Sequence, residues 1–225
     1  MTKNNLAKPP LRSLVQENAW FFYGCLLWIL IGTVGLFTST HGQWVLFFSD
    51  NRTSFWDFFF KYGTQLAEEW AFVLSIFIFL FIRYRTAITL PILAALVTLV
   101  SAVAKKIFHQ PRPLAYFREL GEAEQLTFVE GVKVNQGYTS FPSGHTMAGF
   151  ALFCFIALNV PYKKSVGLGL FCLAMIVGLS RIYLVQHFLR DIYLGSILGV
   201  ALAIGAYYFQ QILGKKAWLD KRLKI

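Results

Sequence analysis

The long apolar runs of this 225-residue chain constrain its fold more than any other feature of the sequence. Hydrophobic residues make up 56% of the chain and charged residues 14%, whereas soluble domains usually carry about 25% charged residues. A soluble protein with a very large core is a poor fit, because the runs approach the length of about 20 residues that crosses a bilayer. The total length favours one domain.

The sequence predicts an all-α fold, a bundle of six transmembrane helices with its active site at the outer membrane–water interface. The six apolar segments lie at residues 20–38, 67–83, 86–106, 144–160, 165–184 and 190–212. The second begins with Glu68 and Glu69, which either shape an outer pocket or merely cap the helix. The aromatic segment 55–60 is too short to span and suits the interface. We expect the first segment to remain as an uncleaved span, because residues 38–41 form a poor signal-peptide cleavage site.

The distribution of Lys and Arg predicts the orientation of this bundle. Twelve of the 21 basic residues fall on the side of the two termini, together with only two of the 11 acidic residues. The positive-inside rule therefore places both termini in the cytoplasm. We predict a cytoplasmic tail at 1–19, a six-helix domain at 20–212 and a basic cytoplasmic tail at 213–225. The charge of +10 is a topology signal, and nucleic-acid binding is not expected.

Three short polar clusters interrupt the apolar sequence, and each lies at the end of an apolar segment. They read Lys105-x6-Arg112-Pro113, then Pro142-Ser143-Gly144-His145, then Ser180-Arg181-x5-His187-x3-Asp191. The predicted topology, which made no use of these residues, places all three clusters on the outer face. Polar residues near a hydrocarbon span usually perform a task. We therefore expect the clusters to converge on one anion-binding site.

The third cluster has the spacing of an oriented nucleophile. His187 and Asp191 are four residues apart, so they share one face of a helix. Asp191 then accepts a hydrogen bond from one imidazole nitrogen and leaves the other free to attack. Taken alone, the pair favours the alternative, a buried histidine whose hydrogen bond is satisfied by a nearby acid.

The other two clusters supply groups for a bound phosphate. Ser143 and Gly144 open a helix whose free N–H groups and dipole favour an anion, and His145 beside them is a candidate proton donor. Arg112 and Arg181 offer planar guanidinium groups that bind phosphate oxygens in pairs, and Lys105 offers a compact ammonium charge. An ordinary N-cap and basic interfacial residues are the alternatives. The interfacial role suits Lys106 and Arg190, which we leave outside the site.

At these positions the chain resembles the type 2 phosphatidic acid phosphatase family, which is related to the vanadium haloperoxidases. The order and internal spacing of the clusters match over residues 65–212. The resemblance implies that His187 attacks phosphorus and forms a phosphohistidine, that Asp191 orients it, and that His145 protonates the leaving oxygen. It further implies phosphate binding by the following residues: Lys105, Arg112, Ser143, Gly144 and Arg181. No metal and no cofactor are implied.

These expectations describe a phosphatase that acts on lipid phosphates at the external face of a bacterial cytoplasmic membrane. Undecaprenyl pyrophosphate, phosphatidic acid, phosphatidylglycerol phosphate and the 1-phosphate of lipid A all present the same phosphoryl group, so the motifs do not choose among them. The loop at 114–141 is either a connector or a substrate lid. Alternatives are a lipid phosphotransferase, vanadate-dependent halide oxidation, and a non-catalytic lipid transporter or binding protein.

Overall fold

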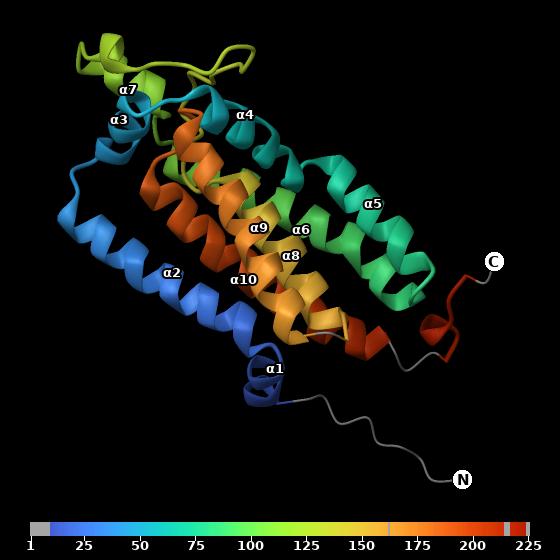
Figure 1. Ribbon diagram of the computed structural model, residues 1–225. Coiled ribbons are helices and arrows are strands. Elements are labelled where there is room, and N and C mark those ends of the chain that lie inside the picture. Colours follow the sequence, from blue (N-terminus) through green and yellow to red (C-terminus); the bar gives the residue numbers. More distant parts are fainter. Residues whose placement is uncertain (1–9, 162, 214–216, 224–225) are drawn as a thin grey trace.

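The chain folds into a bundle of helices (Figure 1), as the computed structural model, which describes residues 10–161, 163–213 and 217–223, shows. No strand forms within these ranges. The elements are α1 (Leu11–Glu17), α2 (Ala19–Thr38), α3 (Gln43–Asp50), α4 (Ser54–Gly63), η1 (Thr64–Ala67), α5 (Glu69–Leu80), α6 (Tyr84–Phe108), α7 (Pro113–Glu119), η2 (Ala123–Gln125), α8 (Gly144–Asn159), α9 (Lys163–Tyr183), α10 (Leu189–Leu213) and η3 (Ala217–Asp220).

The long helices carry the apolar surface that a membrane requires. By length and composition, α2, α6, α9 and α10 are able to cross a bilayer, and the bent pair of α4–η1 and α5 adds a fifth span. Large side chains on α2 face outward, and Phe37 is 87% exposed. Exposed apolar side chains of this size are stable when they face lipid. The chain is therefore a multi-span, all-α membrane protein, as predicted.

Each of the six predicted spans corresponds to a helix, but two of these helices are short. The second predicted span, 67–83, contains only the 12 residues of α5, because the chain bends by 54° between the η1 turn and α5. The fourth, α8, has 16 residues, most of them apolar, and is buried along most of its length. It packs between α9 and α10 as the central helix of the bundle.

Helices α8 and α10 touch almost backbone to backbone. A Cβ added to Gly199 would lie 2.5 Å from the carbonyl oxygen of Met147, and one added to Gly195 would lie 2.8 Å from that of Ser143. Contacts this short exclude any side chain larger than hydrogen at both positions. The start of α8 is thus fixed against the start of α10.

The two ends of the bundle differ in their coverings. Helices α3, α4 and α7 cover one end, called here the α7 end, while α1 and the α5–α6 turn lie at the other, the α1 end (Figure 1). The segment after η3 also lies at the α1 end, because Tyr84 N donates to the carbonyl of Lys221 at 3.0 Å. The predicted tails at 1–19 and 213–225 fall in part outside the described residues.

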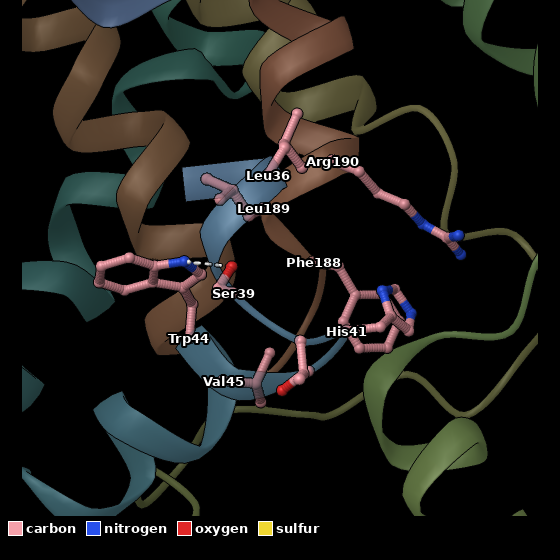
Figure 2. Close-up of a pocket in the computed structure, with 10 residues that line it drawn as sticks. Leu36, Ser39, His41, Trp44, Val45, Phe188, Leu189 and Arg190 are labelled. Carbon is pink, nitrogen blue, oxygen red and sulfur yellow. Dashed lines mark hydrogen bonds between the residues drawn. The ribbon is translucent and has the colours of Figure 1, made fainter. Parts of the chain in front are cut away.

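The predicted outer loop contains α7 and η2 and crosses the α7 end. Beside it, the α2–α3 connection and the start of α10 enclose a cavity of about 190 Å³ (Figure 2). His41 and Phe188 line this cavity, and their ring centroids lie 4.0 Å apart. The connecting segments at the α7 end therefore pack against one another.

Candidate active site

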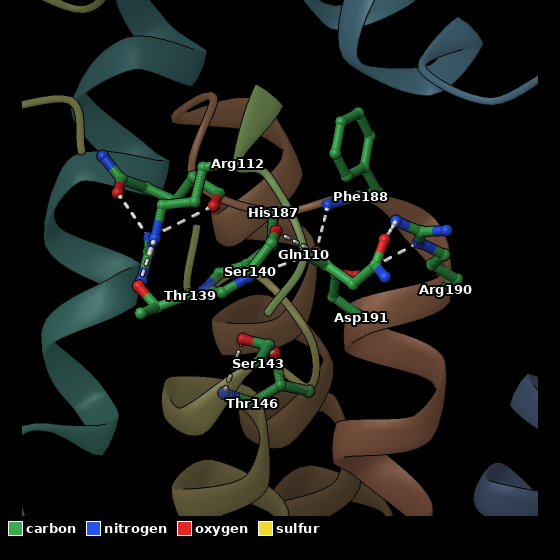
Figure 3. Close-up of polar contacts among 11 residues, drawn as sticks. Gln110, Arg112, Thr139, Ser140, Ser143, Thr146, His187, Phe188, Arg190 and Asp191 are labelled. Atoms are coloured by element: carbon green, nitrogen blue, oxygen red, sulfur yellow. Dashed lines mark hydrogen bonds and ion pairs between the residues drawn. The ribbon is translucent and has the colours of Figure 1, made fainter. Parts of the chain in front are cut away.

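His187 and Asp191 form a buried pair where the chain enters α10. The Nδ1 atom of His187 lies 3.3 Å from Oδ2 of Asp191, and the two side chains are 1% and 0% exposed. The N–H of Phe188 donates to the same oxygen at 2.9 Å (Figure 3). A carboxylate in the first turn of a helix is favoured by the helix dipole. The pair holds the imidazole through Nδ1, which leaves Nε2 free for a ligand.

The environment of His187 keeps its ring neutral. Burial lowers the pKa of His187 from 6.5 to about 4, although the hydrogen bond and charge of Asp191 act in the opposite direction. A neutral ring that donates from Nδ1 to the carboxylate has its lone pair on Nε2. This is the protonation state that a nucleophilic histidine requires at neutral pH.

The turn that delivers His187 is strained. Val185 has a φ of +56°, in the left-handed region that a β-branched residue rarely adopts. The N–H groups of Gln186 and His187 both donate to the carbonyl of Arg181, at 2.9 Å and 3.0 Å, and hold the turn closed. Such strain persists only where the surroundings determine the backbone, and it is frequent at functional sites. Arg181 and His187 are thereby fixed relative to one another.

Ser140 is a further partner of the pair that the sequence analysis did not identify. Its hydroxyl donates to Oδ2 of Asp191 and lies 3.5 Å from Nδ1 of His187. Ser140 is itself fully buried, and its N–H donates to the carbonyl of Gln110 at 3.0 Å. Its place two residues before Pro142 is the only sequence signal of this contact.

The second cluster opens α8, as predicted. Ser143 is the N-cap, and its Oγ accepts hydrogen bonds from the N–H and hydroxyl of Thr146, at 3.4 Å and 2.9 Å. A Cβ on Gly144 would lie 2.8 Å from Oγ of Ser101 and 3.4 Å from Nζ of Lys105. Gly144 thus allows the ammonium group of Lys105 to approach the first turn of α8.

The two predicted arginines are buried and held by neutral oxygen atoms. Arg112, which has the extended backbone expected beside Pro113, donates from Nη1 to both the carbonyl and the side-chain oxygen of Gln186 at 3.2 Å. Arg181 donates from Nη1 to Thr64 Oγ1 at 2.7 Å, and its Nε has no hydrogen-bond partner among the described residues. Neutral acceptors orient a guanidinium and leave its charge available to an anion.

The three clusters meet at His145. This side chain is within electrostatic range of Lys105, Arg112, Arg181 and His187. It also lines two open cavities, of about 490 Å³ and 320 Å³. The structure therefore brings both histidines and all three predicted cations together at the α7 end of the bundle, where His145 and Lys105 border open cavities.

Arg190 also belongs to this arrangement, although the sequence analysis assigned it to the interface. Its Nε lies 3.6 Å from Oδ1 of Asp191, and its Nη2 donates to Gln110 at 3.1 Å. Oδ1 is buried and accepts no hydrogen bond within the described part of the chain. Arg190 thus places a positive charge beside the carboxylate oxygen that does not contact His187. In contrast, Lys106 is exposed, as expected of an interfacial residue.

A third histidine, His41, packs against the ring of Phe188 (Figure 2). Burial lowers the pKa of His41 to about 4, with a smaller contribution from the charge of Arg190. Its ring also contacts Tyr116 edge-on at 4.8 Å, which makes it a packing residue of the α7 end. Within the described ranges, no group of three His, Cys, Asp or Glu side chains is placed to hold a metal ion.

Comparison with protein families gives a match over the region that contains the three polar clusters. The model of the PAP2 superfamily matches residues 86–215, which is more than half of the chain. Lipid phosphate phosphatase 1 of Arabidopsis thaliana is 30% identical over 118 residues, which are 44% of this chain and 36% of that protein. Phosphatidylglycerophosphatase B of Bacillus subtilis is 35% identical over 77 residues, which are 31% of this chain and 38% of that protein. The chain thus covers little more than a third of these relatives.

Two solved structures share the fold. The crystal structure of LpxE from Aquifex aeolicus superimposes with a TM-score of 0.64 at 21% identity, and the match covers 76% of this chain and 96% of that one. The structure of a PAP2-type phosphatidylglycerolphosphate phosphatase from Bacillus subtilis gives a TM-score of 0.62 at 22% identity, covering 88% and 98%. At this level of identity, the likeness establishes the arrangement of the helices alone.

Proposed function

Because the chain belongs to the PAP2 superfamily, we propose that it is a membrane phosphatase that hydrolyses the phosphate headgroup of a lipid through a phosphohistidine. One observation carries the proposal: the buried His187–Asp191 pair leaves Nε2 of a neutral imidazole free beside a second histidine and three cations. A nucleophile, a proton donor and an anion cage are the parts that phosphoryl transfer requires. The names of the relatives, two lipid phosphatases, support the same substrate class.

The geometry favours a two-step reaction. In the first step, the Nε2 lone pair of His187 forms a bond to phosphorus, and the phosphorus–oxygen bond to the lipid breaks. The leaving oxygen keeps the electron pair and takes a proton from His145. In the second step, a water oxygen attacks phosphorus while His145 accepts its proton. The phosphorus–nitrogen bond then breaks, its electron pair returns to Nε2, and inorganic phosphate is released.

The remaining polar groups stabilise the charge that develops on the phosphoryl oxygens. Lys105, Arg112 and Arg181 supply positive charge, and the start of α8 at Ser143 and Gly144 supplies N–H groups. Asp191 orients His187 and stabilises the positive ring that forms on attack. The cavity between α6 and α8, which Val97, Ala102 and Lys105 line, is suited to the part of the lipid tail next to the headgroup.

We place the phosphatase domain at residues 20–212, in a bacterial cytoplasmic membrane with the α7 end outside. The basic tails and the charge asymmetry support an α1 end, and both termini, in the cytoplasm. The substrate would then be reached from the external leaflet.

Phosphate release from a panel of lipid mono- and diphosphates in mixed micelles tests the proposal. We expect release that vanadate inhibits and that a chelator leaves unchanged. A phosphorylated acceptor in place of free phosphate would identify a phosphotransferase. Purified, folded protein that releases no phosphate from any member of the panel would instead favour a lipid-binding protein or transporter.

A further inference from the structure

Glu68 and Glu69 lie in one of the two cavities that open on His145. That cavity, of about 490 Å³, is lined by Ala67, Glu68, Glu69, Trp70 and His145. The neighbouring cavity, of about 320 Å³, shares Ala67 and His145 but is otherwise lined by Lys105 and by small and apolar residues of α6 and α8. His187 lines neither of them. Both cavities are therefore bordered by the candidate proton donor and not by the proposed nucleophile.

The acidic pair is held at this position by the catalytic end of α9. Arg181 is 8% exposed, and its hydrogen bond to Thr64 fixes the η1 turn that immediately precedes Glu68. Ala67, the last residue of that turn, is buried. The charge of Glu68 acts on Arg181 across this contact. The turn that carries Glu68 is thus anchored to α9, and both exposed acidic side chains form a wall of the cavity.

The position of this wall relates it to the leaving group. In an in-line displacement, the group that departs lies opposite the nucleophile. If His187 attacks and His145 donates the proton, as proposed above, the leaving group occupies the cavities that His145 lines. The atoms next to the broken bond then lie beside two carboxylates.

We propose that Glu68 and Glu69 make the enzyme select phosphate monoesters of uncharged alcohols and disfavour diphosphates. From a monoester, the electron pair of the broken bond stays on an alcohol oxygen, which leaves neutral after it takes the proton of His145. From a diphosphate, the same pair stays on an oxygen of a second phosphate, which leaves as an anion beside the acidic wall. The anionic leaving group and the two carboxylates repel one another, whereas hydroxyl groups of an alcohol headgroup are able to donate hydrogen bonds to the carboxylates. This inference rests on the proposed function and narrows its substrate class.

The test compares kcat/KM for a lipid monophosphate and a lipid diphosphate that carry the same tail, with the full-length chain in mixed micelles. We expect wild type to prefer the monophosphate. In the double variant Glu68→Gln/Glu69→Gln, the ratio should shift toward the diphosphate by about tenfold, the order expected for removal of two partly screened charges. The control is Glu122→Gln/Glu124→Gln, which removes two exposed acids from the loop at the α7 end and should leave the ratio unchanged.

Binding distinguishes failure of this inference from failure of the proposed function. A wild type that hydrolyses both lipids at a ratio that the double variant does not change would overturn the inference alone. If no lipid phosphate is hydrolysed, the dissociation constants of a non-hydrolysable lipid phosphonate and its methylene-bisphosphonate counterpart decide the point. A shift of their ratio in the double variant supports the acidic wall, and an unchanged ratio overturns it.

Discussion

The two ends of the bundle each hold a cluster of arginines, but they treat the charge differently. At the α1 end, Arg83 and Arg85 lie 3.8 Å and 3.1 Å from the same carboxylate, that of Asp220, beside a cavity of about 440 Å³. At the α7 end, Arg112 and Arg181 donate to a glutamine and a threonine. Neither is ion-paired with a carboxylate in the described ranges.

Under the proposed function, this difference separates a purely structural ion-pair cluster at the α1 end from a binding site at the α7 end. The carboxylate of Asp220 neutralises part of the charge of the two arginines that it holds, and it ties η3 to the start of α6. Neutral oxygen atoms fix the direction of a guanidinium but leave its charge to be satisfied by a ligand. Excess positive charge held in place before the substrate arrives is the arrangement that stabilises a developing anion. The variants below compare the two ends, in order of decreasing effect.

The largest effect is expected from the histidines of the α7 end. His187→Ala should reduce kcat/KM by at least about a thousandfold because it removes the nucleophile. His145→Ala should reduce it by about a hundredfold or more because the leaving oxygen loses its proton donor. Phosphate release measures both, and circular dichroism checks the fold. The control is Arg83→Ala at the α1 end, and near-normal turnover in either histidine variant would contradict the assigned roles.

Arginine substitutions compare the two ends directly. We expect Arg112→Gln and Arg181→Gln each to lower kcat/KM by about a hundredfold, since each removes one charge from the phosphoryl cage. Vanadate should also inhibit these variants less strongly. Arg83→Gln should leave kcat/KM within about twofold of wild type and lower the thermal unfolding temperature slightly, because exposed ion pairs contribute little. Equal losses of activity from arginine substitutions at the two ends would contradict the distinction between them.

The pKa of His187 provides a test that is independent of turnover. Because burial lowers this pKa to about 4, the ring remains about 90% neutral at pH 5, whereas an ordinary histidine of pKa about 6.5 would be about 3% neutral. The nucleophile is therefore lost only as the pH falls through 4. Titration of ring-labelled histidine by NMR measures the transition, and the variant His187→Gln assigns the signal. A transition near 6.5 would show that the ring is not buried as described.

The smallest effect is expected from Arg190, which acts on the reaction through Asp191. Arg190→Gln should lower kcat about fivefold and leave KM unchanged, since the carboxylate keeps its partners but loses a nearby positive charge. Arg190→Lys should recover part of the loss. The exposed Lys106 offers a matched control, because Lys106→Gln removes one charge from the same end without a contact to the pair. An effect of Arg190→Gln on KM alone would assign it to substrate binding.

Local sequence patterns predicted much of this architecture. The apolar runs located α2, α6, α8, α9 and α10 to within a few residues, because a helix in lipid must satisfy its backbone internally and ends where polar residues begin. The spacing of His187 and Asp191 predicted their contact, but not its geometry, because His187 lies two residues before α10 and not on a helical turn shared with Asp191. The capping of α8 by Ser143 also follows from local chemistry.

Contacts between segments far apart in the chain could not be predicted from the sequence. Thr64 precedes Arg181 by 117 residues, and nothing in its neighbourhood marks it as a partner of a guanidinium. The contact of Arg190 with Asp191 depends on the direction of its side chain, which its position in the first turn does not determine. The second predicted span was too long because the bend before α5 arises from the packing of the η1 turn against α8 and α9.

The close approach of α8 and α10 has a mechanical consequence. Gly195 and Gly199 let the two backbones meet, so His145 and Asp191 are held by two helices that behave as one rigid unit. We expect that α8 and α10 do not separate when a bulky lipid enters the site. Any widening of the entrance for the lipid must then come from segments other than α8 and α10.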